Sequence, residues 1–151
     1  MNIYKIIASF FGIGFIKKGG GTVASLIFCM LLYLGVFLNF YTNILLVIFC
    51  IVTLFIGVIV SKEAERSWEK DSNKIVIDEV LGMAIGLLFL RINLQTLIIG
   101  FVLFRFFDIA KPFYIKRLEK LKNGWGIMMD DVLAGIYTNL VLQILLVMHL
   151  I

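Results

Sequence analysis

Long apolar stretches separated by short polar segments dominate the chain. Five of these stretches predict membrane-spanning helices, although the third and fourth are short. A further apolar stretch at residues 6–16 is shorter still and indicates an interfacial or re-entrant helix. The pattern therefore predicts an all-α, multi-pass integral membrane helical bundle of about five spans, with residues 1–151 forming one domain. The expected spans are residues 22–38, 44–60, 75–90, 94–107 and 132–150.

The composition supports this class. Hydrophobic residues make up 62% of the chain and charged residues only 16%, with a mean hydropathy of +1.05. Soluble domains, by contrast, carry roughly 25% charged residues. Helices are the expected way through the lipid because they satisfy their own backbone hydrogen bonds.

The basic residues predict an orientation in the membrane. Of the 14 lysines and arginines, 13 fall at the N-terminus, in residues 61–74 or in residues 105–131, and only Arg91 falls elsewhere. By the positive-inside rule these three segments are cytoplasmic, and the C-terminus lies outside. Because this bias explains the net charge of +4, a nucleic-acid partner is not expected. The charged residues 61–74 are expected to extend the second spanning helix beyond the membrane.

All ten acidic residues fall on the same predicted side, and five of them adjoin apolar spans. Asp78 and Glu79 open the third span, where an ionised side chain is unfavourable unless something compensates its charge. A snorkelling helix end is the alternative for this pair. Asp130 and Asp131 stand in or near the first turn of the last span, where the helix dipole favours a negative charge. A second adjacent carboxylate repels the first unless a cation lies between them.

Arg105, Asp108 and Lys111 recur every three residues at the end of the fourth span and therefore share one helix face. An interfacial salt bridge is one interpretation of this motif. A metal–phosphate site is the other, because such a site needs a carboxylate for the metal and cations for the phosphate oxygens.

A glycine-rich turn precedes the first long span. Residues 17–22 read Lys-Lys-Gly-Gly-Gly-Thr, so several backbone N–H groups are exposed at a helix N-terminus. Such a turn can bind an anion, although a flexible turn at the membrane surface explains it as well.

Three acidic clusters from distant parts of the chain thus emerge at one predicted membrane face. Hard carboxylate oxygens favour Mg²⁺, and zinc is disfavoured because the single histidine, His149, lies at the far end of the chain. The sequence therefore predicts a magnesium site built from Asp78, Glu79, Asp108, Asp130 and Asp131.

These motifs resemble the phosphatidylglycerophosphatase A family, the magnesium-dependent lipid phosphatases of bacterial inner membranes. The resemblance extends from about Phe11 to the last span and is strongest at residues 78–83, 104–112 and 124–135. The family's Pro-Gly-Thr-x-Gly-Ser motif corresponds to residues 20–25, which read Gly-Gly-Thr-Val-Ala-Ser, so glycine replaces the proline and alanine the second glycine.

The resemblance implies hydrolysis of phosphatidylglycerophosphate to phosphatidylglycerol and phosphate at the cytoplasmic face of the inner membrane. The five acidic residues would then supply the metal ligands and one general base. Arg105 and Lys111 would neutralise the phosphate, and Gly21 and Thr22 would help to cradle it. Direct attack by water and an aspartyl-phosphate intermediate both remain open.

Two other functions use the same residue types. A small transporter or ion pathway could use buried acids as cation sites, but it predicts acids near mid-span and often an internal repeat. A lipid head-group transferase could also use clustered acids and Mg²⁺, but it should carry a nucleotide-binding element. Neither set of features is evident in the sequence.

Overall fold

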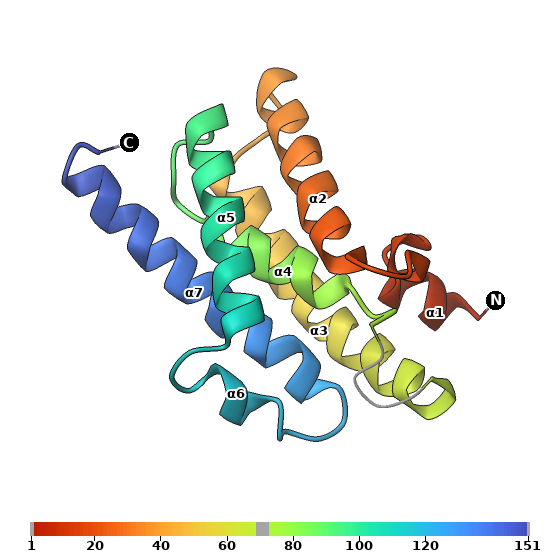
Figure 1. Cartoon of the computed structure of the whole chain (residues 1–151). Coiled ribbons are helices and arrows are strands. Elements are labelled where there is room, and N and C mark those ends of the chain that lie inside the picture. The colour runs from red at the N-terminus through yellow and green to blue at the C-terminus, as the bar shows by residue number, and fades with distance from the viewer. Residues whose placement is uncertain (1, 69–72, 151) are drawn as a thin grey trace.

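The computed structural model describes residues 2–68 and 73–150, and all regular structure within these ranges is helical (Figure 1). The prediction of an all-α fold is therefore confirmed. The elements are α1 (Ile3–Ala8), the 3-10 helix η1 (Ile13–Phe15), α2 (Gly20–Phe37), α3 (Asn43–Ser67), α4 (Ile77–Gly86), α5 (Leu94–Ala110), α6 (Ile115–Leu118) and α7 (Trp125–Val147).

Three helices of the described chain, α2, α3 and α7, are long and apolar enough to cross a membrane. Helix α5, with 17 residues, is about 25 Å long. Helix α4 has only 10 residues and is about 15 Å long, roughly half of a 30 Å hydrocarbon core. The expected span at residues 75–90 is thus a short helix that ends at Gly86, and the predicted count of five spans is not confirmed.

Local sequence signals set the ends of the longer helices. Helix α3 begins where the Thr42 side chain accepts a hydrogen bond from the backbone N–H of Leu45. In the same way, Asn93 accepts one from Thr96 at the start of α5. These side chains satisfy N–H groups that a helix leaves free at its first turn. Helix α3 continues past its apolar stretch to Ser67, which confirms the predicted extension up to that residue; residues 69–72 of the charged segment lie outside the described residues.

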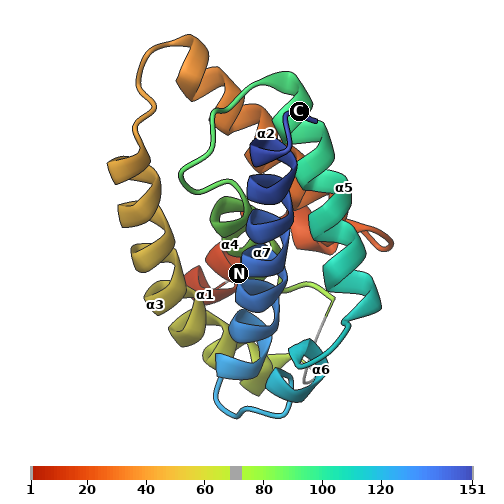
Figure 2. The same cartoon turned by 90° about the vertical axis from the view of Figure 1, so that its left-hand side faces the viewer.

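The two ends of the bundle differ in charge. The α2–α3 connection, the α4–α5 connection and the C-terminus lie at one end, and the last turns of α3, helix α6 and the start of α7 lie at the other (Figures 1 and 2). Arg91 lies in the α4–α5 connection, whereas Lys116 and Arg117 belong to α6. Most of the lysines and arginines thus lie toward the end of the bundle that carries α6, and the acidic motifs lie toward the same end.

Helix α4 lies in the middle of the bundle and packs most closely against α7 (Figure 2). A Cβ placed on Gly135 would overlap the carbonyl oxygen of Gly82, and a Cβ placed on Gly82 would lie 2.6 Å from the carbonyl oxygen of Asp131. The two backbones are therefore in direct contact, as small residues allow in membrane helices. Any larger side chain at this crossing would separate the helices.

The C-terminal end of α4 is closed by a side chain of α7. Asn139 Nδ2 donates hydrogen bonds to the carbonyl oxygens of Gly86, at 3.1 Å, and Leu88, at 2.8 Å. Gln143 in turn donates to Asn139 Oδ1 at 2.6 Å. A helix that stops inside an apolar bundle leaves carbonyl groups without partners, and irregular backbone is tolerated there only where such groups are satisfied. Asn139 therefore allows α4 to end at that depth.

The N-terminal segment fixes the other end of α4. The Val76 N–H donates to the carbonyl oxygen of Ala8 at 2.9 Å. A Cβ on Gly14 would overlap the carbonyl group of Lys74, so the backbone around η1 lies directly against the chain that leads into α4. The short N-terminal helix thus supports the first turn of α4.

Candidate active site

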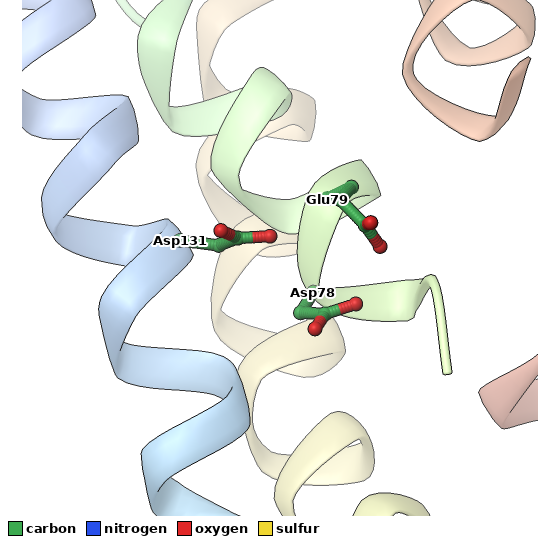
Figure 3. Close-up of side chains that lie close together, drawn as sticks. All are labelled: Asp78, Glu79 and Asp131. Atoms are coloured by element: carbon green, nitrogen blue, oxygen red, sulfur yellow. The ribbon is translucent and has the colours of Figure 1, made fainter. Parts of the chain in front are cut away.

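The first turn of α4 and the second turn of α7 bring three carboxylates together. Asp78, Glu79 and Asp131 each offer an oxygen that lies within 4.8 Å of the others. Figure 3 shows the first two at the start of α4 and Asp131 pointing toward them from the facing turn of α7. Asp78 stands four residues before Gly82, and Asp131 four residues before Gly135. The glycine contact therefore lies one helical turn beyond the carboxylates and holds both helices at this spacing.

Within the described residues, no lysine or arginine forms an ion pair with these carboxylates. Asp131 is 3% exposed. Asp78 Oδ1 and Glu79 Oε2 are buried and have no hydrogen-bond partner. The Asp78 side chain lies beside the Glu79 and Asp131 carboxylates, whose negative charges repel its own. Such a group of hard oxygen donors fits a divalent cation, which would supply the missing partner for the buried oxygens.

A second set of acidic residues surrounds Lys111, whose ammonium lies 2.7 Å from Asp130 Oδ2 and 2.5 Å from Glu119 Oε1. Lys111 caps the C-terminus of α5 in a left-handed conformation, with φ of 43°. Burial alone lowers the pKa of this lysine, but its hydrogen bonds to Asp130 and Glu119 outweigh burial and raise the pKa above the ordinary value. Lys111 is therefore a permanent cation at this site.

Arg105 and Asp108 form a third charged unit on α5. Arg105 Nη1 lies 2.7 Å from Asp108 Oδ2, and both side chains are mostly buried. The contact is an ion pair without hydrogen-bond alignment, because Nη1 and Nε of Arg105 make no hydrogen bond. The salt bridge that was one interpretation of this motif is thus present. The Asp108 carboxylate also lines the cavity described next.

A polar cavity of about 270 Å³ joins these units. Its lining includes one cation and six carboxylates, from Lys111 and from Asp78, Glu79, Asp108, Glu119, Asp130 and Asp131. All five acids singled out by the sequence thus converge, although the group that satisfies the metal-site spacing contains only three of them. Arg105 is outside this lining and contacts Asp108, which belongs to it.

The glycine-rich turn lies beside the three-carboxylate group. A Cβ on Gly21 would overlap the Glu79 carboxylate, so a glycine is required for this close approach. Helix α2 begins after Gly19, whose φ of 82° is also readily adopted only by glycine. Thr22 follows in the first turn of α2 and is half-buried, but it is outside the set of residues that line the cavity. The sequence motif thus places Gly21, and not Thr22, against the acidic site.

Two details differ from what the sequence alone indicates. Helix α7 begins at Trp125, so Asp130 and Asp131 lie beyond its first turn, and the helix dipole does not explain them. Sequence reasoning also missed Glu119 and Asn73, which line the cavity. Glu119 is the only acid between the basic residues 116–122, and that isolation is a signal that could have identified it.

Comparisons with known proteins agree on one family. The family profile described as Phosphatidylglycerophosphatase A matches residues 6–146. A protein named Phosphatidylglycerophosphatase A from Haemophilus influenzae is 38% identical over 145 residues, which cover 93% of this chain and 87% of that protein. Its namesake from Escherichia coli is 34% identical over 89% of this chain and 78% of the relative.

A third relative carries a different name. A Bacteroides thetaiotaomicron protein, provisionally named as a phosphatidylinositol-3-phosphatase, is 35% identical over 92% of this chain and 91% of its own length. No solved structure matches the chain. The named relatives thus share a lipid phosphomonoester as substrate class and differ in the head group.

Proposed function

The chain belongs to the phosphatidylglycerophosphatase A family and is a membrane phosphatase, and from that premise we propose that it hydrolyses phosphatidylglycerophosphate to phosphatidylglycerol and phosphate. One observation carries the proposal: Asp78, Glu79 and Asp131 converge from two helices on one small polar cavity in an otherwise apolar bundle. A polar site at one end of a bundle suits a lipid whose phosphate stays at head-group level while its acyl chains remain in the bilayer.

We propose that the cation of this site is Mg²⁺ and that Asp78, Glu79 and Asp131 hold it. The support is the donor set, since carboxylate oxygens are the ligands that Mg²⁺ prefers, and the two buried oxygens that have no partner. When bound, Mg²⁺ would withdraw charge from a phosphoryl oxygen and so favour attack at phosphorus. The same ion would reduce the repulsion among the three carboxylates.

The remaining residues of the cavity act on the substrate in this proposal. Lys111 would neutralise a phosphate oxygen, and the N–H groups at the start of α2, beside Gly21 and Thr22, would contribute further positive potential. Arg105 would hold the Asp108 carboxylate in position. In hydrolysis a water oxygen bonds to phosphorus while a carboxylate of the site takes a proton from that water. The phosphorus–oxygen ester bond breaks, and the leaving glycerol oxygen is protonated.

The charge pattern supports a proposal for the location in the cell. We propose a multi-pass protein of the bacterial inner membrane, with the acidic cavity at the cytoplasmic leaflet. The support is the position of the cavity at the end of the bundle that carries α6 and the last turns of α3, where lysines and arginines concentrate. A transporter is not favoured, because the relatives are phosphatases and the acids gather at one end of α4.

The decisive experiment measures phosphate release by the purified protein in detergent, with and without Mg²⁺. Phosphatidylglycerophosphate and phosphatidylinositol 3-phosphate would be compared as substrates, because named relatives differ on this point. We expect faster release from phosphatidylglycerophosphate, dependence on Mg²⁺ and loss of release in Asp78→Ala. A wild-type protein that releases no phosphate would exclude the phosphatase. Undiminished release in Asp78→Ala would exclude the assigned metal site.

A further inference from the structure

Among the described residues that line the cavity, Lys111 is the one cation. Its ammonium group is already paired with two carboxylates of the protein. Its ammonium contacts Asp130 on α7 at 2.7 Å and Glu119, one residue past α6, at 2.5 Å. A phosphate group that enters the cavity must therefore compete with a carboxylate of the protein for this nitrogen. The question is which of the two carboxylates gives way.

Asp130 is held in place. Its side chain is 8% exposed, it lies within a long helix, and its second oxygen accepts a hydrogen bond from the Asp131 N–H at 3.0 Å. Moving it would break two interactions of a buried charge, which is strongly unfavourable.

Glu119 is held much less firmly. Its side chain is 38% exposed, and the adjoining helix α6 has only four residues. Within the described chain, its carboxylate pairs with Lys111. A half-exposed carboxylate of this kind exchanges its cation for water at little cost. Glu119 is therefore the carboxylate that can leave.

We propose that Glu119 is an internal competitor of the substrate phosphate: its carboxylate takes the place of a phosphate oxygen at Lys111, and substrate displaces it. The proposal rests on the proposed function, since it assigns Lys111 to the phosphate. Glu119 acts through Lys111 and is a positioning residue.

The test is Glu119→Gln, which keeps the size of the side chain and removes its charge. With Mg²⁺ present, we expect inorganic phosphate to bind about fivefold more tightly by isothermal titration calorimetry, the factor for an ion pair of ~1 kcal/mol. The KM for the lipid substrate should fall by a similar factor, while kcat stays the same or decreases because product leaves more slowly. Damage to the fold would instead raise KM or lower kcat and would not increase the affinity for inorganic phosphate.

Two control variants separate this effect from a general change of charge. Glu63→Gln removes a carboxylate from a comparable ion pair, with Arg66 at 2.7 Å, at the same end of the bundle but outside the cavity. It should leave phosphate affinity unchanged. In a Lys111→Gln background, Glu119→Gln should no longer raise the affinity for phosphate. The lysine for which the Glu119 carboxylate and the phosphate compete is then absent.

Equal phosphate affinity in Glu119→Gln and Glu63→Gln would overturn this inference while wild-type hydrolysis still supported the proposed function. Absence of both hydrolysis and phosphate binding in the wild type would overturn the function and the inference together.

Discussion

Two groups of carboxylates share one cavity and differ in what neutralises them. In the paired group, Asp108, Glu119 and Asp130, each carboxylate lies 2.5–2.7 Å from a nitrogen of a basic side chain. In the unpaired group, within the described chain, no lysine or arginine forms an ion pair, and two oxygens are buried without a hydrogen-bond partner. The unpaired group consists of Asp78, Glu79 and Asp131.

The difference divides one acidic site into two functions. Ion-paired carboxylates are stable without a ligand and can hold cations in position for a phosphate. Carboxylates without partners repel one another and would be stabilised by a cation from solution, as proposed above. Neighbours in sequence fall into different groups: Asp130 and Asp131 point about 100° apart on α7, so one faces Lys111 and the other faces α4. Sequence proximity is therefore a poor guide to shared chemistry here.

Removing a charge from the unpaired group has the largest expected effect. Asp131→Asn keeps the shape of the side chain but deletes a ligand for the cation. We expect phosphate release to fall more than about 100-fold, and affinity for Mn²⁺ as a spectroscopic substitute to fall with it. Electron paramagnetic resonance would measure the Mn²⁺ affinity. Asp130→Asn, one residue earlier, should change that affinity by less than about tenfold, and equal losses in both variants would remove the distinction between the groups.

A methyl group at the helix crossing should weaken the unpaired group without touching any carboxylate. In Gly135→Ala the new Cβ would overlap the Gly82 carbonyl oxygen and force α4 away from α7. We expect a loss of about 1–3 kcal/mol of stability in detergent and weaker Mn²⁺ binding. Gly35→Ala is the matched control, since a Cβ there meets no atom within 4 Å. Thermal unfolding of both variants would measure the change in stability. If Gly135→Ala had the stability and the Mn²⁺ affinity of the wild type, the close contact between α4 and α7 would be contradicted.

The paired group should respond through substrate binding. Arg105→Gln leaves Asp108 without its cation, and loss of a charged partner of this kind corresponds to about a tenfold effect. We expect the KM for the lipid to rise by about that factor while Mn²⁺ affinity changes little. Steady-state kinetics with a parallel Mn²⁺ titration would measure both. If Mn²⁺ affinity fell more than KM rose, Arg105 would belong with the unpaired group.

The smallest effect is expected at the far end of α4. Asn139→Leu removes the hydrogen bonds to the Gly86 and Leu88 carbonyl oxygens, and such interactions in membrane proteins contribute about 0.6–1.7 kcal/mol. Stability should drop by that amount, and phosphate release should stay within about twofold of wild type. Gln143→Leu, which removes only the contact to Asn139, should cost less. A large loss of activity in Asn139→Leu would mean that this end of α4 also shapes the site.

The sequence could single out the acids of this candidate site because its signals are local. A carboxylate at the edge of an apolar stretch is visible without coordinates, and all five acids singled out in this way line the cavity, while their roles stay a prediction. The helical class and the extension of α3 to Ser67 followed from apolar length and from helix-forming composition in the same way.

Other features depend on contacts between distant residues, which a single sequence does not reveal. Residues 87–90 are as apolar as the helix before them, yet α4 ends at Gly86 because Asn139, far along the chain, bonds the free carbonyl groups. The division of the acids into two groups has the same origin, since it depends on which helix each side chain faces. The proposed role of Glu119 likewise depends on its contact with Lys111, which lies on the other side of α6 in the sequence.

The short central helix has a consequence for the sidedness of the enzyme. Beyond the carboxylates, Met83, Ala84 and Leu87 are completely buried and apolar, so the cavity does not continue along the bundle in that direction. In the proposed orientation, head groups would therefore reach the carboxylates from the end of the bundle that carries α6. A lipid made in the opposite leaflet would then have to change leaflets before this protein could dephosphorylate it.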